Sequence, residues 1–113
     1  ERSQAPRLRA AKADRASAEM RYQASARTSA ARFASEAAAW RAAQDNIAVL
    51  ERNIAAVQDE IAAQLTTYES GVGDYAPIID GEIAILKLRS DIATEAARMA
   101  AAIARMNALL VQS

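Results

Sequence analysis

The stretch that decides the fold is residues 65–80, LTTYESGVGDYAPIID, which contains two of the three glycines and one of the two prolines of the chain. It separates two long segments of periodic apolar residues, so it predicts the bend of a helical hairpin. Gly71 can adopt φ > 0 without strain, which is a common way to end a helix. Asp74 is placed to accept hydrogen bonds from the first free N–H groups of the next helix, and Pro77 is tolerated in a first turn.

The segment before the bend carries apolar residues at spacings that alternate mostly between three and four. This spacing is typical of a helix that packs along one seam, as in coiled coils. No helix breaker follows Pro6, so we predict one helix over about residues 6–70, about 95–100 Å long at 1.5 Å per residue. Its seam is formed by Phe33, Trp40, Ala43, Ile47, Leu50, Ile54, Val57, Ile61, Leu65 and Tyr68.

The segment after the bend predicts a shorter helix over about residues 75–111, with two apolar stripes. A surface helix in a simple hairpin needs only one such stripe. Two stripes therefore favour neighbours on both sides, as in the wall of a helical barrel. The first consists of Ile78, Ile85, Leu88, Ile92, Met99, Ala102, Met106 and Leu109. The second consists of Ile79, Ile83, Leu86, Ala93, Ala97, Ala100 and Ala104.

The chain of 113 residues is thus predicted to be a single all-α unit, a long antiparallel hairpin with its tip at 71–74. The second helix should end opposite about residue 34, which leaves the chain up to about position 32 without a partner. A further helix is expected to cover this overhang. The predicted facing pairs are Ile61 with Ile83 and Ile85, Ile54 with Ile92, Ile47 with Met99, and Trp40 with Met106.

Composition excludes several classes of function. Cysteine and histidine are absent, so thiolate chemistry, imidazole bases and the usual zinc ligands are not available. We find no catalytic constellation among the remaining carboxylates and predict no enzyme, cofactor or bound metal. No run approaches the roughly 18 apolar residues of a membrane span. The chain begins without Met, which favours a piece of a longer protein.

Charge is distributed unevenly along a chain whose formal net charge is zero. The basic residues gather in the first 45 positions, and no basic residue occurs between Arg52 and Lys87. The predicted tip is therefore acidic and the far end basic. Acidic residues and alanines interleave with the arginines, and no aromatic stacking platform accompanies them, so nucleic-acid binding is not expected. The acidic residues near the tip are Asp59, Glu60, Glu69, Asp74, Asp80 and Glu82.

Residues 68–82, YESGVGDYAPIIDGE, followed by Leu86 and the ARMNALL run at 104–110, resemble the TolC-type outer-membrane efflux family. Its repeats are similar to Y-x-x-G, a few residues, a hydrophobic-Asp-Ala turn and an amphipathic helix. The NALL run is similar to the heavy-metal efflux branch. Two positions depart from the family pattern: Pro77 stands where an aspartate is frequent, and Gly81 where alanine is usual.

The resemblance implies a homotrimer with a periplasmic α-helical barrel, of which this hairpin would be a segment in an outer-membrane protein. The tip would close the export duct and dock a periplasmic adaptor (membrane-fusion) protein, and through it an inner-membrane pump. Small molecules or metal ions would be the exported substrates. Asp80, Glu82 and Asp74 would then be candidates for a charged gate at the aperture.

Gly71, Val72 and Gly73 would be candidates for the adaptor contact, because a small tip exposes its backbone. Local roles are the alternative for both sets of residues. Asp74 could serve only as a helix cap, and the glycines could only form the turn. The carboxylates of Asp80 and Glu82 could only interact favourably with the positive N-terminal end of the helix dipole. Two other functions remain open. The chain could be a free-standing hairpin that dimerises as a four-helix bundle and acts as an interaction module. It could also be the coiled-coil hairpin of the adaptor, although its tip has no arginine.

Overall fold

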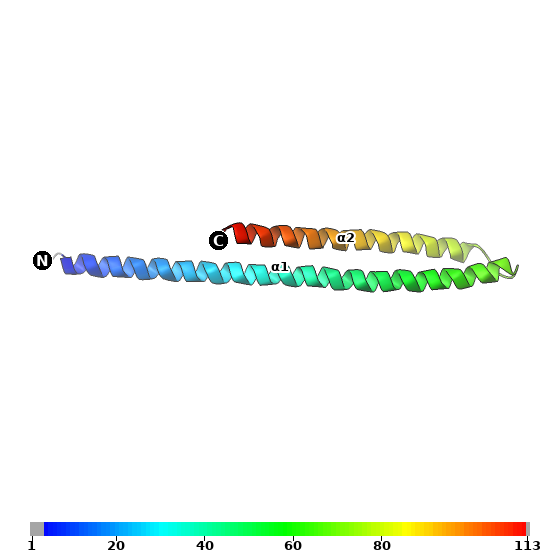
Figure 1. Cartoon of the computed structure of the whole chain (residues 1–113), viewed down its shortest axis with the longest axis horizontal. Helices are drawn as coiled ribbons and strands as arrows, with labels where there is room; N and C mark the ends of the chain where they lie inside the picture. The colour runs from blue at the N-terminus through cyan, green and yellow to red at the C-terminus, as the bar shows by residue number, and fades with distance from the viewer. Residues whose placement is uncertain (1–3, 113) are drawn as a thin grey trace.

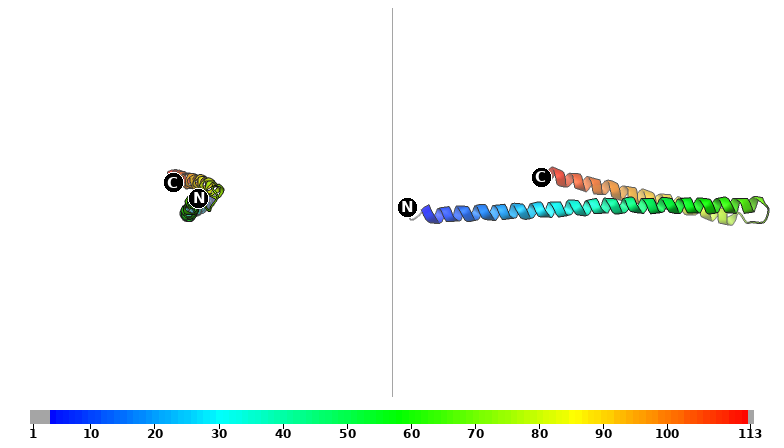
Figure 2. Two further views of the ribbon diagram at one scale, coloured as in Figure 1. Left: turned by 90° about the vertical axis from the view of Figure 1, so that its right-hand side faces the viewer. Right: turned by 60° about the horizontal axis from the view of Figure 1, so that its bottom comes forward.

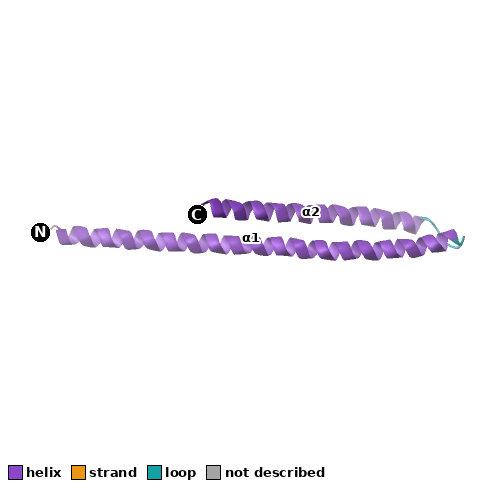
Figure 3. Cartoon of the chain, viewed as in Figure 1, coloured by secondary structure: helices purple, strands orange, loops and turns teal. Residues whose placement is uncertain are grey.

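The computed structural model describes residues 4–112 and consists of two helices, α1 (Gln4–Glu69) and α2 (Ala76–Gln112). They run antiparallel and are joined by the short tip, so the chain forms an extended hairpin (Figures 1 and 3). The rod measures 105 × 15 × 15 Å. The prediction of an all-helical hairpin is confirmed. Each helix begins or ends within about two residues of the expected position.

A single apolar seam holds the two helices together. Ala43 on α1 and Ile78, Ile85 and Ala102 on α2 are buried along it. The other seam residues, from Phe33 to Ile61 on α1 and from Leu88 to Leu109 on α2, are half-buried. Figure 2 shows α2 crossing α1 at a shallow angle, as expected for helices that follow a heptad repeat. Because the core is a single narrow seam, most of its side chains keep one edge in contact with solvent.

The register of the two helices differs from the predicted one by about one turn. Three cross-helix contacts define it: Glu36 with Arg105, Asn46 with Glu95, and Ile61 with Gly81. Ile61 therefore faces Gly81 instead of the predicted Ile83 and Ile85. Extending the same register places Trp40 opposite Ala102 instead of Met106, Ala43 opposite Met99, and Ile54 opposite Leu88.

One physical reason for this register is that a large side chain, Ile61, meets the smallest residue, Gly81. A Cβ atom built on Gly81 would lie 2.6 Å from Cγ1 and 2.9 Å from Cδ1 of Ile61. Gly81 is thus a notch that receives the Ile61 side chain and lets the two helices approach closely. The predicted register would have placed isoleucines against each other at this level. Sequence reasoning counted apolar residues and gave no weight to their size.

The seam also ends differently from the prediction on the tip side. Leu65 and Tyr68 were expected on the seam but are exposed, whereas Gln64 is half-buried there. Gln64 follows Ile61 by three residues, so its side chain faces α2. The side chain of Leu65 points about 100° further round the helix. Tyr68 is exposed because α2 begins only at Ala76, so no helix lies opposite it.

Residues 4–28 of α1 extend beyond α2, and all of them are exposed. The heptad positions that continue the seam carry Leu8 and Tyr22 but also Lys12, Arg15 and Glu19, so no continuous apolar seam runs along this stretch. Leu8, Met20 and Tyr22 are isolated exposed apolar side chains in this stretch. The overhang predicted from the unequal helix lengths is therefore present in the hairpin.

Candidate functional site

The tip is closed by a Schellman motif at the end of α1. Gly71 has φ +83°, and its N–H donates to the carbonyl of Tyr68 at 3.0 Å. The Val72 N–H donates to the Thr67 carbonyl at 3.4 Å, which completes the motif. The Gly73 N–H and the Ser70 hydroxyl donate to the same carbonyl, at 3.3 and 2.6 Å. The predicted glycine C-cap is confirmed at Gly71.

The start of α2 is capped by Asp74. Its Oδ1 accepts a hydrogen bond from the Ala76 N–H at 3.3 Å, as predicted from the sequence. The first helical bond runs from the Ile79 N–H to the Tyr75 carbonyl at 3.2 Å, so Pro77 lies in the first turn, where its missing N–H costs nothing. The rings of Tyr68 and Tyr75 lie 5.1 Å apart between centroids and join the two sides of the tip.

Replacing Asp74 with Ala should destabilise the hairpin by about 0.5–1 kcal/mol, because the Ala76 N–H loses its acceptor. Denaturant unfolding followed by circular dichroism at fixed chain concentration measures this loss. The Asp74→Asn variant retains an acceptor oxygen and should lose less than half as much. An equal loss in both variants would show that the carboxylate charge near the helix end, rather than the hydrogen bond, is responsible.

The three residues predicted to contact an adaptor occupy the end of the rod. Val72 is 84% exposed although it is apolar. Gly71 has open space where a Cβ would lie, whereas a Cβ on Gly73 would be 3.0 Å from Thr67 Cγ2 and 3.1 Å from the Tyr68 nitrogen. Gly71 is required for its backbone angle and Gly73 for space. The structure of the tip therefore explains why both positions are glycine. Nothing within the hairpin explains an exposed apolar side chain at Val72.

The predicted gate carboxylates are not brought together by the hairpin. Asp74 caps α2, whereas Asp80 and Glu82 are exposed on α2, about 200° apart around the helix axis. Asp80 lines a shallow groove between the helices together with Glu60 and Gln64, and no basic side chain lines it. Glu82 lies on the opposite flank. The spacing of two residues, visible in the sequence, already separates Asp80 and Glu82 on any helix.

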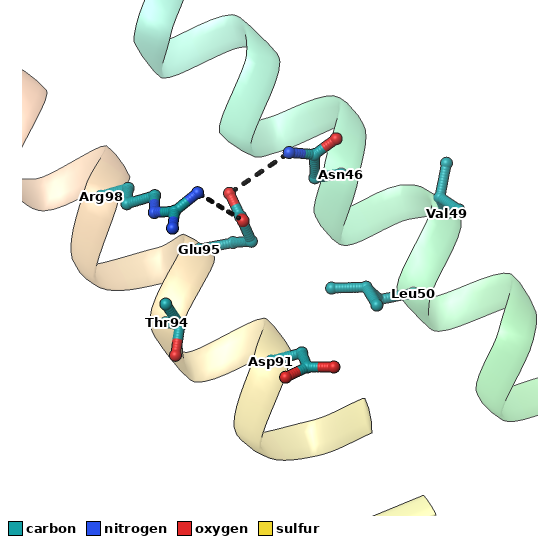
Figure 4. A pocket seen from close by; sticks show the side chains of 7 residues that line it. All are labelled: Asn46, Val49, Leu50, Asp91, Thr94, Glu95 and Arg98. Atoms are coloured by element: carbon teal, nitrogen blue, oxygen red, sulfur yellow. Dashed lines mark hydrogen bonds and ion pairs between the residues drawn. The ribbon is translucent and has the colours of Figure 1, made fainter. Parts of the chain in front are cut away.

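A polar cluster interrupts the seam half-way along α2, and sequence reasoning missed it. The side chain of Glu95 is only 12% exposed and occupies a seam position. Its carboxylate accepts from Arg98 Nη1 at 3.1 Å and from Asn46 Nδ2 at 3.4 Å. Figure 4 shows Glu95 reaching between the helices beside Leu50, which points into the same groove. A gap of seven residues between Ile92 and Met99 was the signal, since the intermediate seam position is Glu95.

A second polar contact lies nearer the end of α2. Arg105 Nε donates to Glu36 Oε2 at 2.7 Å, and Glu36 again occupies a seam position. Close by, the indole N–H of Trp40 is buried without a hydrogen-bond partner within residues 4–112. Polar groups on a narrow seam stabilise it little but oppose a shift of register, because a shift would leave them facing apolar residues. These contacts explain how a hairpin of repetitive sequence keeps one alignment.

The largest apolar feature outside the seam lies on the opposite side of α2. Ile79, Ile83 and Leu86 are 49%, 59% and 64% exposed, in successive turns beginning near the tip. The second apolar stripe predicted from the sequence is therefore present on α2 and uncovered. We call it the outer face of α2, and it consists of Ile79, Ile83, Leu86, Ser90, Ala93, Ala97, Ala100 and Ala104.

The chain matches no protein-family profile, no curated protein and no solved structure. Its candidate sites therefore rest on the geometry above. Within α1 and α2, no stretch long enough to cross a membrane is sufficiently apolar to do so. Across residues 4–112, no three carboxylates are grouped closely enough to hold a metal ion. Three parts of the hairpin remain as candidate functional surfaces: the tip, the overhang and the outer face of α2.

Proposed function

We propose that this hairpin is an assembly element that builds a helical wall with further helices. The observation that carries the proposal is that α2 has two apolar faces, one packed on α1 and one exposed. A helix inside a wall has a neighbour on each side, and its second apolar face is then covered. The exposed Ile79, Ile83 and Leu86 are unusual for a helix that needs only one partner.

The wall that we propose is the periplasmic α-barrel of an outer-membrane efflux duct, formed as a homotrimer. This assignment is supported by the resemblance of residues 68–82 to the TolC-type family and by the exposed outer face of α2. In this function the tip with Val72 would meet a periplasmic adaptor coupled to an inner-membrane pump. Asp80 would face the aperture, and Glu82 would lie on the other flank of α2.

Fractionation of the source cells tests this function. An antibody raised against residues 60–90 should detect, in the outer-membrane fraction, a protein several times heavier than the 12.1 kDa of this chain. Markers for the inner membrane and the periplasm control the fractionation. A band at the size of this chain in a soluble fraction would exclude the duct, because a chain of that size lacks the remaining wall helices.

A second candidate is a free-standing hairpin that serves as an interaction module. One observation favours it specifically: near the tip, charged residues of both signs flank the outer face of α2. Asp80 and Glu82 lie nearer the tip, and Lys87 and Arg89 follow two turns later. Such a pattern matches a partner helix that carries the same charges in the opposite order.

A further inference from the structure

The outer face of α2 has four charged flanking residues that have no partners of their own. Asp80, Glu82, Lys87 and Arg89 are all exposed, and none makes an ion pair or side-chain hydrogen bond within residues 4–112. Asp80 and Lys87 are seven residues apart, as are Glu82 and Arg89. Oppositely charged side chains pair along a helix at a spacing of three or four, so these residues cannot neutralise each other on α2.

The four charges lie on two sides of the apolar residues. Asp80 and Lys87 follow one edge of the outer face, and Glu82 and Arg89 follow the other, because residues seven apart lie above one another on a helix. On each edge the acidic residue is nearer the tip and the basic residue farther from it. A second α2 that runs antiparallel presents the reverse order along the same edge.

We propose that the outer face of α2 binds a second copy of this chain, with the two α2 helices antiparallel and a twofold axis between Ala84 and Ile85. In this register Asp80 faces Lys87 of the second copy on one edge, and Glu82 faces Arg89 of the second copy on the other. The twofold axis repeats both pairs, so four ion pairs flank the contact.

The apolar residues fit the same register. Ile83 lies against Leu86 of the second copy, and Ile79 lies against Ser90, so the large exposed side chains at the tip end of α2 become covered. A slip of one heptad in either direction removes the match. One slip places Asp80 on Asp80 and Glu82 on Glu82, and the other places Lys87 on Lys87 and Arg89 on Arg89. The charges thus select one alignment and disfavour its neighbours.

The chain exposes more surface than a compact protein of its mass, because it is a narrow rod whose overhang, residues 4–28, is bare. It exposes 8635 Å², whereas a compact protein of its mass exposes about 6,000 Å², an excess of about 2,600 Å². A stable interface covers about 800 Å² on each partner. The inference deepens the second candidate function, the interaction module. In a cyclic trimer all tips point the same way, so an antiparallel contact on the outer face of α2 is an alternative to the efflux duct and not part of it.

Sedimentation equilibrium of the full chain over a range of concentrations tests the dimer. The K87E/R89E variant makes all four flanking residues acidic, so its dissociation constant should rise at least tenfold. The D80K/E82K variant makes all four basic and should be weakened similarly. Mixed in equal amounts, the two variants should form a heterodimer at least as tight as the original dimer. The R41E/R52E variant is the matched control, with the same change of net charge on exposed sites of α1.

Orientation is tested by disulfide formation, which is straightforward because the chain has no cysteine. The I79C/S90C variant should cross-link into a covalent dimer under mild oxidation, whereas I79C alone should not, since the two copies of residue 79 lie far apart in an antiparallel pair. A monomer at all concentrations, a trimer, a dimer that tolerates K87E/R89E as well as R41E/R52E, or cross-linking by I79C alone would each overturn the proposal. Circular dichroism establishes that every variant is helical. Fractionation tests the duct and sedimentation tests the antiparallel dimer, so failure of one proposal is distinguished from failure of the other.

Discussion

The Gly81→Leu variant is expected to lose about 2 kcal/mol of stability, the net of overpacking at the seam and a gain in helix propensity. Because a Cβ at this position already lies 2.6 Å from Ile61 Cγ1, a leucine can enter only if the Ile61 side chain changes rotamer or α2 moves away from α1. Overpacking of this kind costs about 1–3 kcal/mol, and the better helix propensity of leucine offsets about 1 kcal/mol. The severe overlap places the cost of overpacking at or above the upper end of its range. Urea unfolding at fixed chain concentration measures the loss.

A double-mutant cycle shows whether the notch at Gly81 is the cause. Ile61→Ala alone should also destabilise the hairpin, since it leaves the notch empty. The combined Gly81→Leu and Ile61→Ala variant exchanges the large and the small residue across the seam, and it should be more stable than either single variant. If the stability losses of the two single variants simply added, Ile61 would not pack directly into the notch. The register in which Ile61 faces Gly81 would then be contradicted.

Replacing Gly71 with Val is expected to cost about 2 kcal/mol, because the left-handed backbone region is strained for residues with a Cβ. Nothing lies within 4 Å of a Cβ at this position, so the cost comes only from holding a β-branched residue at φ +83°. The Schellman motif requires this angle, and the bonds to the carbonyls of Thr67 and Tyr68 depend on it. Thermal unfolding monitored by circular dichroism, with the loss of stability evaluated at the midpoint, measures the effect.

Gly71→Asn is the matched control, because asparagine tolerates the left-handed region far better than valine. It should lose less than half as much stability as Gly71→Val. If the two variants were equally destabilised, the size of the side chain rather than the backbone angle would be the cause. The contrast with Gly73 is informative, since any side chain there meets the backbone of Thr67 and Tyr68 even at a permitted angle.

Much of the fold could be predicted because it depends on local signals. Heptad spacing indicated the two helices and their seam, and the glycines and Asp74 indicated the bend and its caps. The register could not be derived from the same signals, because it is set by the sizes of facing residues such as Ile61 and Gly81. The polar seam residues Glu36 and Glu95 were missed because only apolar residues were counted.

The candidate sites were predictable to a smaller degree. The second stripe on α2 was visible in the sequence, and the structure shows that it is exposed. The predicted gate of Asp80, Glu82 and Asp74 depends on copies contributed by three subunits. Within one chain Asp80 and Glu82 point in nearly opposite directions, because they are two residues apart on a helix. Whether three subunits would gather copies of Asp80 depends on contacts between chains, which no pattern within one chain determines.

The bare part of α1 has a consequence for how the rod opens. Residues 4–28 are the bare end of α1, so their helical hydrogen bonds are supported by no tertiary packing and can open from the N-terminal end while the rest of α1 stays paired. Their amide hydrogens should therefore exchange with solvent far faster than those of residues 40–61, which open only when the hairpin separates. The rod thus comprises two cooperative units within one continuous helix. A protease specific for basic residues should shorten it from the overhang and stop where α2 begins to cover α1.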